Sequence, residues 1–252
     1  DDALGMKYLI IFYSVITVVC GIMVFLKMDN QKMEKGEKVE LKDLWTVLRM
    51  PAVWIIGVVT FCTYVFCLSL YYFVSYSTSL MGASVTFGAA IAAFKRYISP
   101  VSNVGGGFLS DKFGTSNLML ISFIVMGVGT IGILALPLEA GYLVIFTVLY
   151  LTIYFFFNVN YALTWAMMEE GNIPVNVSGT AAGIIATIGY LPEVFVSLLA
   201  GGMIDKYPGA TGYRYFFIFL IITMAVGAFS VLVWKRHLKK NAVETNTDRV
   251  AQ

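Results

Sequence analysis

Charged residues are scarce in this chain. They make up 13% of its 252 residues, whereas 59% are hydrophobic and 15% are aromatic. A soluble domain carries about 25% charged residues, so this composition excludes an ordinary water-soluble fold. It also excludes a disordered chain and a basic nucleic-acid-binding domain, and the net charge of +2 says little until the charges are located.

Cysteine and histidine are scarce as well. Cys20, Cys62 and Cys67 lie inside apolar segments, and their odd number argues against a disulfide framework. The single histidine is His237, near the C-terminal end, so no cluster of metal ligands is expected. The chain has no phosphate-binding glycine pattern after a strand, and its apolar part holds no Ser/His/Asp set. We therefore expect no cofactor, no metal and no enzyme activity.

Long apolar segments are what the chain has in abundance. A helix needs about 20 mostly apolar residues to cross the hydrocarbon core of a bilayer. Seven segments qualify, and they lack the polar–apolar alternation of a membrane β-barrel. The segments are 8–26, 52–75, 84–104, 117–136, 141–163, 177–203 and 214–234. The sequence predicts an all-α membrane protein with seven transmembrane helices.

Glycine is frequent in these apolar segments, with 23 residues in the chain. Small residues let helix backbones approach closely in lipid. We expect Gly127, Gly129 and Gly132 to mark such a packing face. A short amphipathic helix is predicted over residues 41–50, at the membrane surface, ending where Pro51 opens the second span.

The basic residues favour one side of the seven-helix arrangement. Cytoplasmic loops collect lysine and arginine. The 27–51 link, the turn after the third span and the tail together hold 12 of the 17 basic residues, whereas the opposite side holds three. The C-terminal tail is therefore predicted to be cytoplasmic, in an inner or plasma membrane. The first residue would then lie outside without an export signal, and we expect the chain to be the C-terminal part of a longer protein.

A short motif separates the third and fourth predicted helices. The sequence reads GFLSDKFGT from Gly107 to Thr115. Glycines at the helix end allow close packing, Asp111 places a carboxylate at a cytoplasmic turn, and Gly114 permits a sharp reversal.

This segment resembles the G-x-L-a-D-r-x-G-r-k signature of the major facilitator superfamily of secondary transporters. The matching positions are Gly107, Leu109, Asp111, Lys112 and Gly114, while Thr115 and Ser116 replace the usual basic pair. A second Asp-Lys turn follows at Asp205. In two inverted three-helix repeats, the first turn would lie inside and the second outside.

The resemblance implies a domain organisation. Residues 1–27 would be the last helix of an N-terminal half, 28–50 the central cytoplasmic loop, 51–234 a C-terminal six-helix half and 235–252 a cytoplasmic tail. The partner would be the missing N-terminal six-helix half. Within the superfamily, the segment 178–190 looks like the branch that carries organic anions, sugar phosphates and sugar acids.

Charged side chains at membrane depth are costly and usually face a cavity or the bundle interior. Lys95 and Arg96, in the third predicted span, are candidates to bind an anion. Alternatively, they pair with a helix terminus or extend to the interface. Glu193, which follows Pro192, could take up a coupling proton, or it could be a structural partner of Lys95 or Arg96.

Neutral polar residues supply further candidates for substrate contacts. Asn158 and Asn160 point in different directions, so one could line a cavity while the other packs. Three tyrosines of the second span could offer hydroxyls to a ligand, or could be interfacial aromatics: Tyr64, Tyr71 and Tyr72. The pair Glu169 and Glu170 is expected to latch a gate together with Gly107, Asp111, Lys112, Gly114 and Asp205.

The function expected from this reading is secondary active transport of a small organic anion by alternating access. A sugar acid, sulfosugar or sugar phosphate would move with a proton or other ion, or by exchange. One alternative is a carrier of cations, drugs or neutral solutes, in which Glu193 controls binding. Another is a membrane receptor or scaffold that does not transport.

Overall fold

Helices joined by short turns and links make up the described part of the chain. The computed structural model describes residues 2–27 and 41–250, with side chains over 5–27 and 42–240. These ranges contain no strand, which confirms the all-α class. The chain divides into two units, Asp1–Lys38 and Val39–Gln252.

The first unit contains α1 (Asp2–Lys27). Ser14 and Thr17 turn their hydroxyls back onto the carbonyls of Ile10 and Tyr13 of the same helix, at 2.9 and 2.8 Å. These two hydroxyls are thereby satisfied within the helix itself, as an apolar surrounding demands.

The second unit contains the remaining helices. They are α2 (Leu41–Leu48), α3 (Pro51–Leu80), α4 (Val85–Phe113), α5 (Thr115–Ala135), the 3₁₀ turn η1 (Ala140–Tyr142), α6 (Leu143–Glu170), α7 (Val175–Tyr190), α8 (Pro192–Lys206) and α9 (Ala210–Val250). The predicted connector helix before Pro51 is present as α2. The preceding part of the predicted loop, residues 28–40, lies outside the described residues.

Six segments of the described chain are long and apolar enough to cross a membrane. They are Gly5–Lys27, Pro51–Leu80, Thr115–Ala135, Ala140–Glu170, Val175–Lys206 and Ala210–Lys240. Six of the predicted spans are confirmed in this sense, and the predicted span 84–104 is not. Its helix forms as α4, but Lys95, Arg96 and several hydroxyl and amide residues make it too polar for this class.

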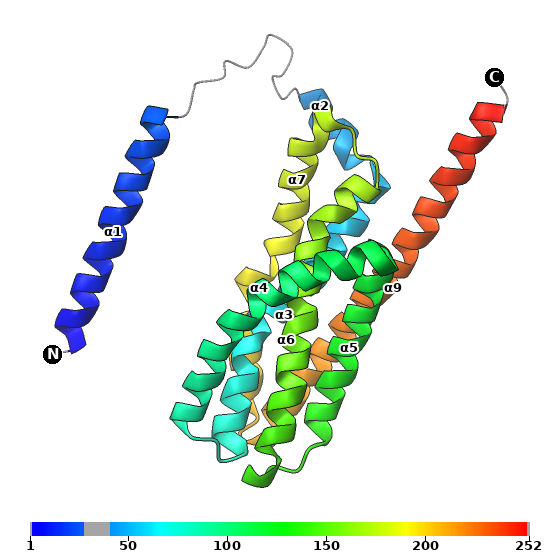
Figure 1. Ribbon diagram of the computed structural model, residues 1–252. Helices are drawn as coiled ribbons and strands as arrows, with labels where there is room; N and C mark the ends of the chain where they lie inside the picture. Colours follow the sequence, from blue (N-terminus) through cyan, green and yellow to red (C-terminus); the bar gives the residue numbers. More distant parts are fainter. Residues whose placement is uncertain (1, 28–40, 251–252) are drawn as a thin grey trace. The chain divides into compact units, whose positions relative to one another are not determined.

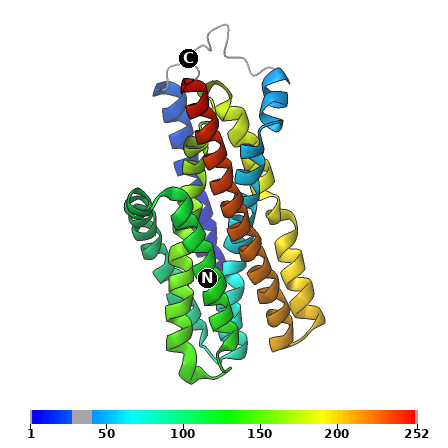
Figure 2. The ribbon, with the colours of Figure 1, turned by 90° about the vertical axis from the view of Figure 1, so that its right-hand side faces the viewer.

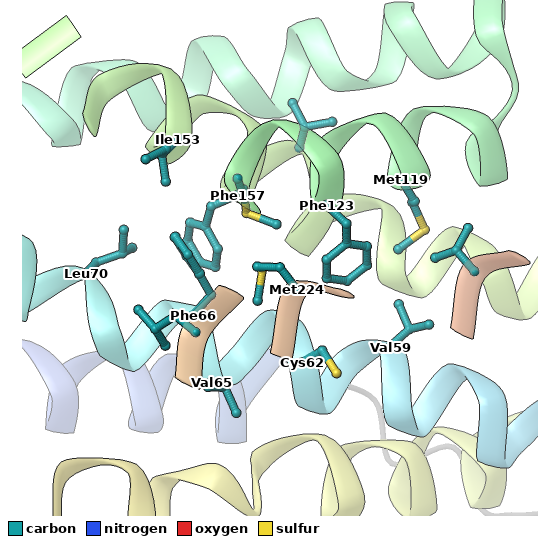
Figure 3. Packing of buried hydrophobic residues seen from close by; sticks show 14 of the residues in the cluster. Val59, Cys62, Val65, Phe66, Leu70, Met119, Phe123, Ile153, Phe157 and Met224 are labelled. Carbon is teal, nitrogen blue, oxygen red and sulfur yellow. The ribbon is translucent and has the colours of Figure 1, made fainter. Parts of the chain in front are cut away.

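The long helical segments of the second unit alternate in direction (Figure 1). They are α3, α4, α5, α6, α7 together with α8, and α9. At the end where α3 finishes, the Tyr76 ring stacks on Phe146 at the start of α6 and lies edge-on to Tyr213 at the start of α9. We call this the Leu80 end, and the opposite one the Pro51 end. Apolar side chains of α3, α5, α6 and α9 form the core between these four helices. Phe66 of α3 faces Phe157 of α6 there (Figure 3).

Local sequence signals explain where these helices begin and turn. Pro51 is the first residue of α3, as predicted. The Ser84 hydroxyl caps α4 by accepting a hydrogen bond from the Phe87 amide at 3.1 Å. Gly114, at a φ of 81°, makes the predicted reversal between α4 and α5.

The glycines of α5 pack against neighbouring helices, as predicted. A Cβ atom added at Gly129 would lie 2.7 Å from Ile153, and one at Gly132 would lie 3.3 Å from Leu149. Both contacts join α5 to α6. Gly127 faces α9, where an added Cβ would lie 3.7 Å from Met224. These residues therefore set the close approach of three helices.

Helix α4 bends at Pro100. Before the bend it follows α6 residue for residue, since Lys95 lies over Tyr154 and Ser99 is bonded to Asn158. After the bend, Gly106 packs on Val159, so seven residues of α4 advance by only one residue of α6. The second half of α4 therefore crosses its neighbour (Figures 1 and 2). Proline causes such a bend because it lacks the amide hydrogen and clashes with the preceding turn.

The last helix is longer than predicted. The sequence predicts a span over 214–234 and a frayed polar tail, whereas α9 continues to Val250. No glycine or proline follows Gly227, and lysine, arginine and alanine favour the helix, so nothing in the sequence ends it at Trp234.

Candidate functional site

A cavity of about 630 Å³ lies between α3, α4 and α6. Its walls are mostly apolar and include Leu70, Val74 and Phe157, while Cys67 and Tyr71 contribute a thiol and a hydroxyl. Lys95 is the one charged residue among its lining residues. This cavity therefore offers an anion a single positive charge in surroundings of low polarity.

The Lys95 side chain is half-buried and is held by aromatic rings. Its Nζ atom lies 5.3 Å from the ring centroid of Tyr154 and 5.8 Å from that of Tyr150. Both rings belong to α6, and the ring faces attract the ammonium group electrostatically. The Tyr150 hydroxyl donates to the Leu70 carbonyl at 3.2 Å, which fixes one of these rings against α3. Lys95 is thus held by aromatic rings and not by a carboxylate of the described residues.

Arg96, the next residue of α4, is exposed and does not line this cavity. Successive helix residues point about 100° apart, so the side chains of Lys95 and Arg96 point in different directions. Within the described residues, neither cation forms an ion pair with a carboxylate. The structure therefore separates Lys95, inside the cavity, from Arg96, outside it.

The two asparagines of α6 face different helices, as predicted, but neither lines the cavity. Asn158 is buried against α4, where its Oδ1 atom accepts from Ser99 at 2.8 Å. Asn160 is fully buried against α3, and its Nδ2 atom donates to the Thr63 hydroxyl at 3.3 Å. The Oδ1 atom of Asn160 has no hydrogen-bond partner in the described chain. Both side chains join helices.

The three tyrosines of α3 are placed in three different surroundings. Tyr71 is exposed and lines the cavity. Tyr72 points to the other side, where its hydroxyl donates to the Ser197 carbonyl of α8 at 3.4 Å. Tyr64 packs on Tyr190, the last residue of α7, with ring centroids 4.6 Å apart. Of the three, Tyr71 is thus the one in the cavity.

A second polar cluster surrounds the break between α7 and α8. Pro192 starts α8, and Glu193 follows it on the exposed side. The Glu193 carboxylate lies near the Tyr64 hydroxyl. The hydroxyls of Tyr161 and Tyr190 lie near each other. We call Tyr64, Tyr161, Tyr190 and Glu193 the tyrosine cluster.

Sequence reasoning missed Tyr161 and Tyr190. They come from α6 and α7 and meet α3 and α8 only in the folded chain. One signal was available, because Tyr190 immediately precedes the Leu191-Pro192 break, and discontinuous membrane helices mark binding sites in transporters.

Glu170 joins three helices at the Pro51 end. Its Oε2 atom accepts hydrogen bonds from the Ser116 hydroxyl of α5 at 2.7 Å and from Nε1 of Trp234 of α9 at 2.9 Å. Beside it, Lys235 Nζ donates to Asn117 Oδ1 at 2.7 Å, which adds a second link between α5 and α9. Glu169 is exposed.

Replacing Glu170 by alanine is expected to lower the unfolding temperature of the purified protein by about 3–8 °C. Hydrogen bonds between membrane helices contribute about 0.6 kcal/mol each and up to about 1.7, and 1 kcal/mol shifts the midpoint by about 2–4 °C at this size. Glu170→Gln keeps an acceptor oxygen and should lose less. Glu169→Ala is the matched control, and equal losses at both positions in a thermal unfolding assay would refute the role of Glu170.

The other motif residues lie on the surface of the second unit. Asp111, Lys112 and Asp205 are exposed, and no described side chain forms an ion pair with them. A Cβ added at Gly107 would meet nothing within 4 Å, whereas Gly106 packs on Val159 at 3.3 Å. Close packing in this glycine run thus belongs to Gly106. The first Asp-Lys pair precedes the turn between α4 and α5, and the second precedes the turn between α8 and α9 at the Leu80 end of the unit (Figure 1).

The geometry defines the class of protein: a helical membrane protein with several apolar spans and a cavity that exposes one lysine. Comparison with known sequences adds two relatives. Inner membrane protein YqcE of Escherichia coli (strain K12) is 28% identical over 226 residues, covering 85% of this chain and 53% of the relative. Inner membrane protein YihN of the same strain is 25% identical over 244 residues, covering 92% of this chain and 58% of the relative. The chain spans little more than half the length of these relatives.

These comparisons correct the superfamily prediction. No family model matches the chain, and both relatives are named as inner membrane proteins and nothing more specific. The prediction of membership in the major facilitator superfamily is therefore wrong on these findings. It depended on five matched positions around one turn and on a second Asp-Lys turn at Asp205. In the folded chain, Gly107 packs on no neighbouring helix, and Asp111 forms no ion pair with a described side chain.

Proposed function

We propose that this protein carries a small organic anion across the inner membrane by secondary active transport, with no enzymatic step. The observation that supports this most directly is the cavity between α3, α4 and α6, in which Lys95 is the one charged lining residue. A lysine held at cavity depth without an ion-pair partner favours an anionic ligand, because an unpaired charge in low-polarity surroundings is costly until a counter-charge binds.

We also propose that α4 crosses the membrane as a seventh span despite its polarity. Helices α3 and α5 both run from the Pro51 end towards the Leu80 end (Figure 1). The chain can run twice in the same direction only if the helix between them returns it. Residues 85–104 of α4 make this return, and of their polar side chains Lys95 lines the cavity and Ser99 is bonded to Asn158 of α6.

Alternating access is supported by the arrangement of the helices. Three long segments (α3, α4 and α5) precede the link between α5 and α6, three (α6, α7–α8 and α9) follow it, and an Asp-Lys pair comes before the third segment of each set. Inverted repeats of this kind carry substrate sites at their interface in many transporters. The relatives are nearly twice as long as the matched part, which supports a second set of helices as the partner that completes the cavity.

The basic residues support a cytoplasmic C-terminus, with residues 28–50 on the same side. Both curated relatives are named as inner membrane proteins, which supports that membrane for this chain too. Glu170 and its partners would then form a cytoplasmic latch that holds α5, α6 and α9. Glu193, exposed at the α7–α8 break, is the proposed site of a coupling proton.

The test is ligand-dependent thermal stabilisation of the purified protein. Glucuronate and glucose 6-phosphate serve as anionic probes and glucose as the neutral control. An anion is expected to raise the unfolding temperature, and Lys95→Gln should weaken its affinity by about 10- to 100-fold, because hydrogen bonds to charged groups contribute about 1.5–3 kcal/mol. Arg96→Gln is the matched control, since Arg96 lies outside the cavity.

The opposite result would redirect the proposal. Stabilisation by quaternary ammonium compounds, lost in Glu193→Gln and retained in Lys95→Gln, would favour a carrier of cations. No stabilisation by any solute would favour a receptor or scaffold.

A further inference from the structure

The cavity and the tyrosine cluster lie on one continuous face. Tyr64, Cys67 and Tyr71 follow at spacings of three and four residues, so they share one side of α3. Tyr71 lines the cavity, and Tyr64 belongs to the cluster. The Cys67 thiol lies between them, within electrostatic reach of both the Lys95 ammonium and the Glu193 carboxylate. Tyr64 and Tyr71 are seven positions apart, which corresponds to about 10 Å of helix.

The two ends of this face have opposite chemistry. At the Lys95 end the walls are mostly apolar apart from residues that carry a hydroxyl, Tyr71, Thr78 and Tyr154, and the ammonium group can only donate hydrogen bonds. At the Glu193 end, three tyrosine hydroxyls can donate or accept, and the carboxylate accepts. Tyr64 and Tyr190 also present ring faces beside these hydroxyls.

Resting on the proposed function, we infer that the tyrosine cluster is a second subsite, which binds the hydroxyl groups of a polyhydroxylated anion whose charged group lies at Lys95. At the cluster a ligand hydroxyl finds hydroxyls that donate or accept together with a carboxylate acceptor, whereas the cavity wall is mostly apolar and carries no carboxylate. A buried hydroxyl without a partner loses binding energy, so the position of the cluster orients the ligand along α3.

The inference is tested with three six-carbon carboxylates of equal chain length, measured by titration calorimetry on the purified protein. Gluconate carries five hydroxyls, hexanoate carries none, and 6-aminohexanoate carries a terminal ammonium group. Gluconate is expected to bind at least tenfold more tightly than hexanoate. Tyr64→Phe, which keeps the ring on Tyr190, and Glu193→Gln should each reduce this ratio several-fold and leave hexanoate affinity unchanged.

Two controls separate the subsites. Tyr72→Phe removes a hydroxyl from the other side of α3 and should leave the ratio unchanged. Lys95→Gln should weaken gluconate and hexanoate together. Hexanoate binding as tightly as gluconate, or an unchanged ratio in both cluster variants, would overturn the inference while leaving the proposed function intact. Tighter binding of 6-aminohexanoate would also overturn it, by assigning the cluster to a cation. Failure of all three carboxylates to bind would overturn the proposed function with it.

Discussion

Gly189→Ala is expected to destabilise the protein strongly. Helices α3 and α7 cross at this residue, where an added Cβ would lie 2.4 Å from Cγ2 and 2.8 Å from Cβ of Thr60. Thr60 is buried, and its hydroxyl is bonded to the Ile56 carbonyl at 2.7 Å, so it cannot turn aside. Overpacking costs about 1–3 kcal/mol and occasionally more. We expect a loss near the upper end, seen as a drop of about 6–12 °C in unfolding temperature.

Gly183→Ala is the matched control in the same helix. It is exposed, and an added Cβ would meet nothing within 4 Å. Alanine favours a helix over glycine by about 1 kcal/mol, so this variant should be unchanged or slightly more stable. The double variant Gly189→Ala with Thr60→Gly, which removes the clashing side chain, should recover part of the loss. A loss of equal size at Gly183 would show that the close crossing is not the cause.

Trp234→Ala is the second substitution with a large expected effect. Trp234 is fully buried in α9, its ring lies against Gly171, and its indole nitrogen donates to Glu170. Truncating a buried tryptophan costs about 3–5 kcal/mol in protein cores. The cavity left behind and the lost hydrogen bond should together lower the unfolding temperature by about 10 °C or more.

Trp165→Ala supplies the comparison for this change. Trp165 is 38% exposed on α6, so its removal leaves no closed cavity and should cost much less. Trp234→Phe keeps most of the ring but not the donor, and it should fall between the two. Equal unfolding temperatures for the two alanine variants would show that Trp234 is not a packing centre.

The sequence predicts what depends on local composition. Apolar length identifies six spans, and proline and glycine identify the start of α3 and the reversal at Gly114. The same criterion also predicted a span over 84–104, where the chain forms a helix too polar for that class. Composition shows how many polar residues a segment has but not where they point. The Ser99 hydroxyl, for example, is hydrogen-bonded to Asn158 of the neighbouring helix α6.

The site could be predicted only in part. Lys95 stands out in any reading because it is a charge in an apolar segment. The tyrosine cluster does not, because its members come from four helices and meet only through the crossing of α3 and α7. The motif at Gly107–Thr115 failed for a related reason, since matched letters do not show whether a side chain finds a partner in the folded chain.

The bend of α4 has a mechanical consequence. A helix that runs along its neighbour contacts it over many residues, but one that crosses its neighbour contacts it over a shorter length. Before Pro100, α4 is attached to α6 through the contact of Lys95 with Tyr154 and the hydrogen bond of Ser99 to Asn158. After Pro100, Gly106 packs closely on Val159 of α6. We expect a displacement of the surface turn at Gly114 to move the second half of α4 more readily than the first, which stays attached to α6 through Lys95 and Ser99.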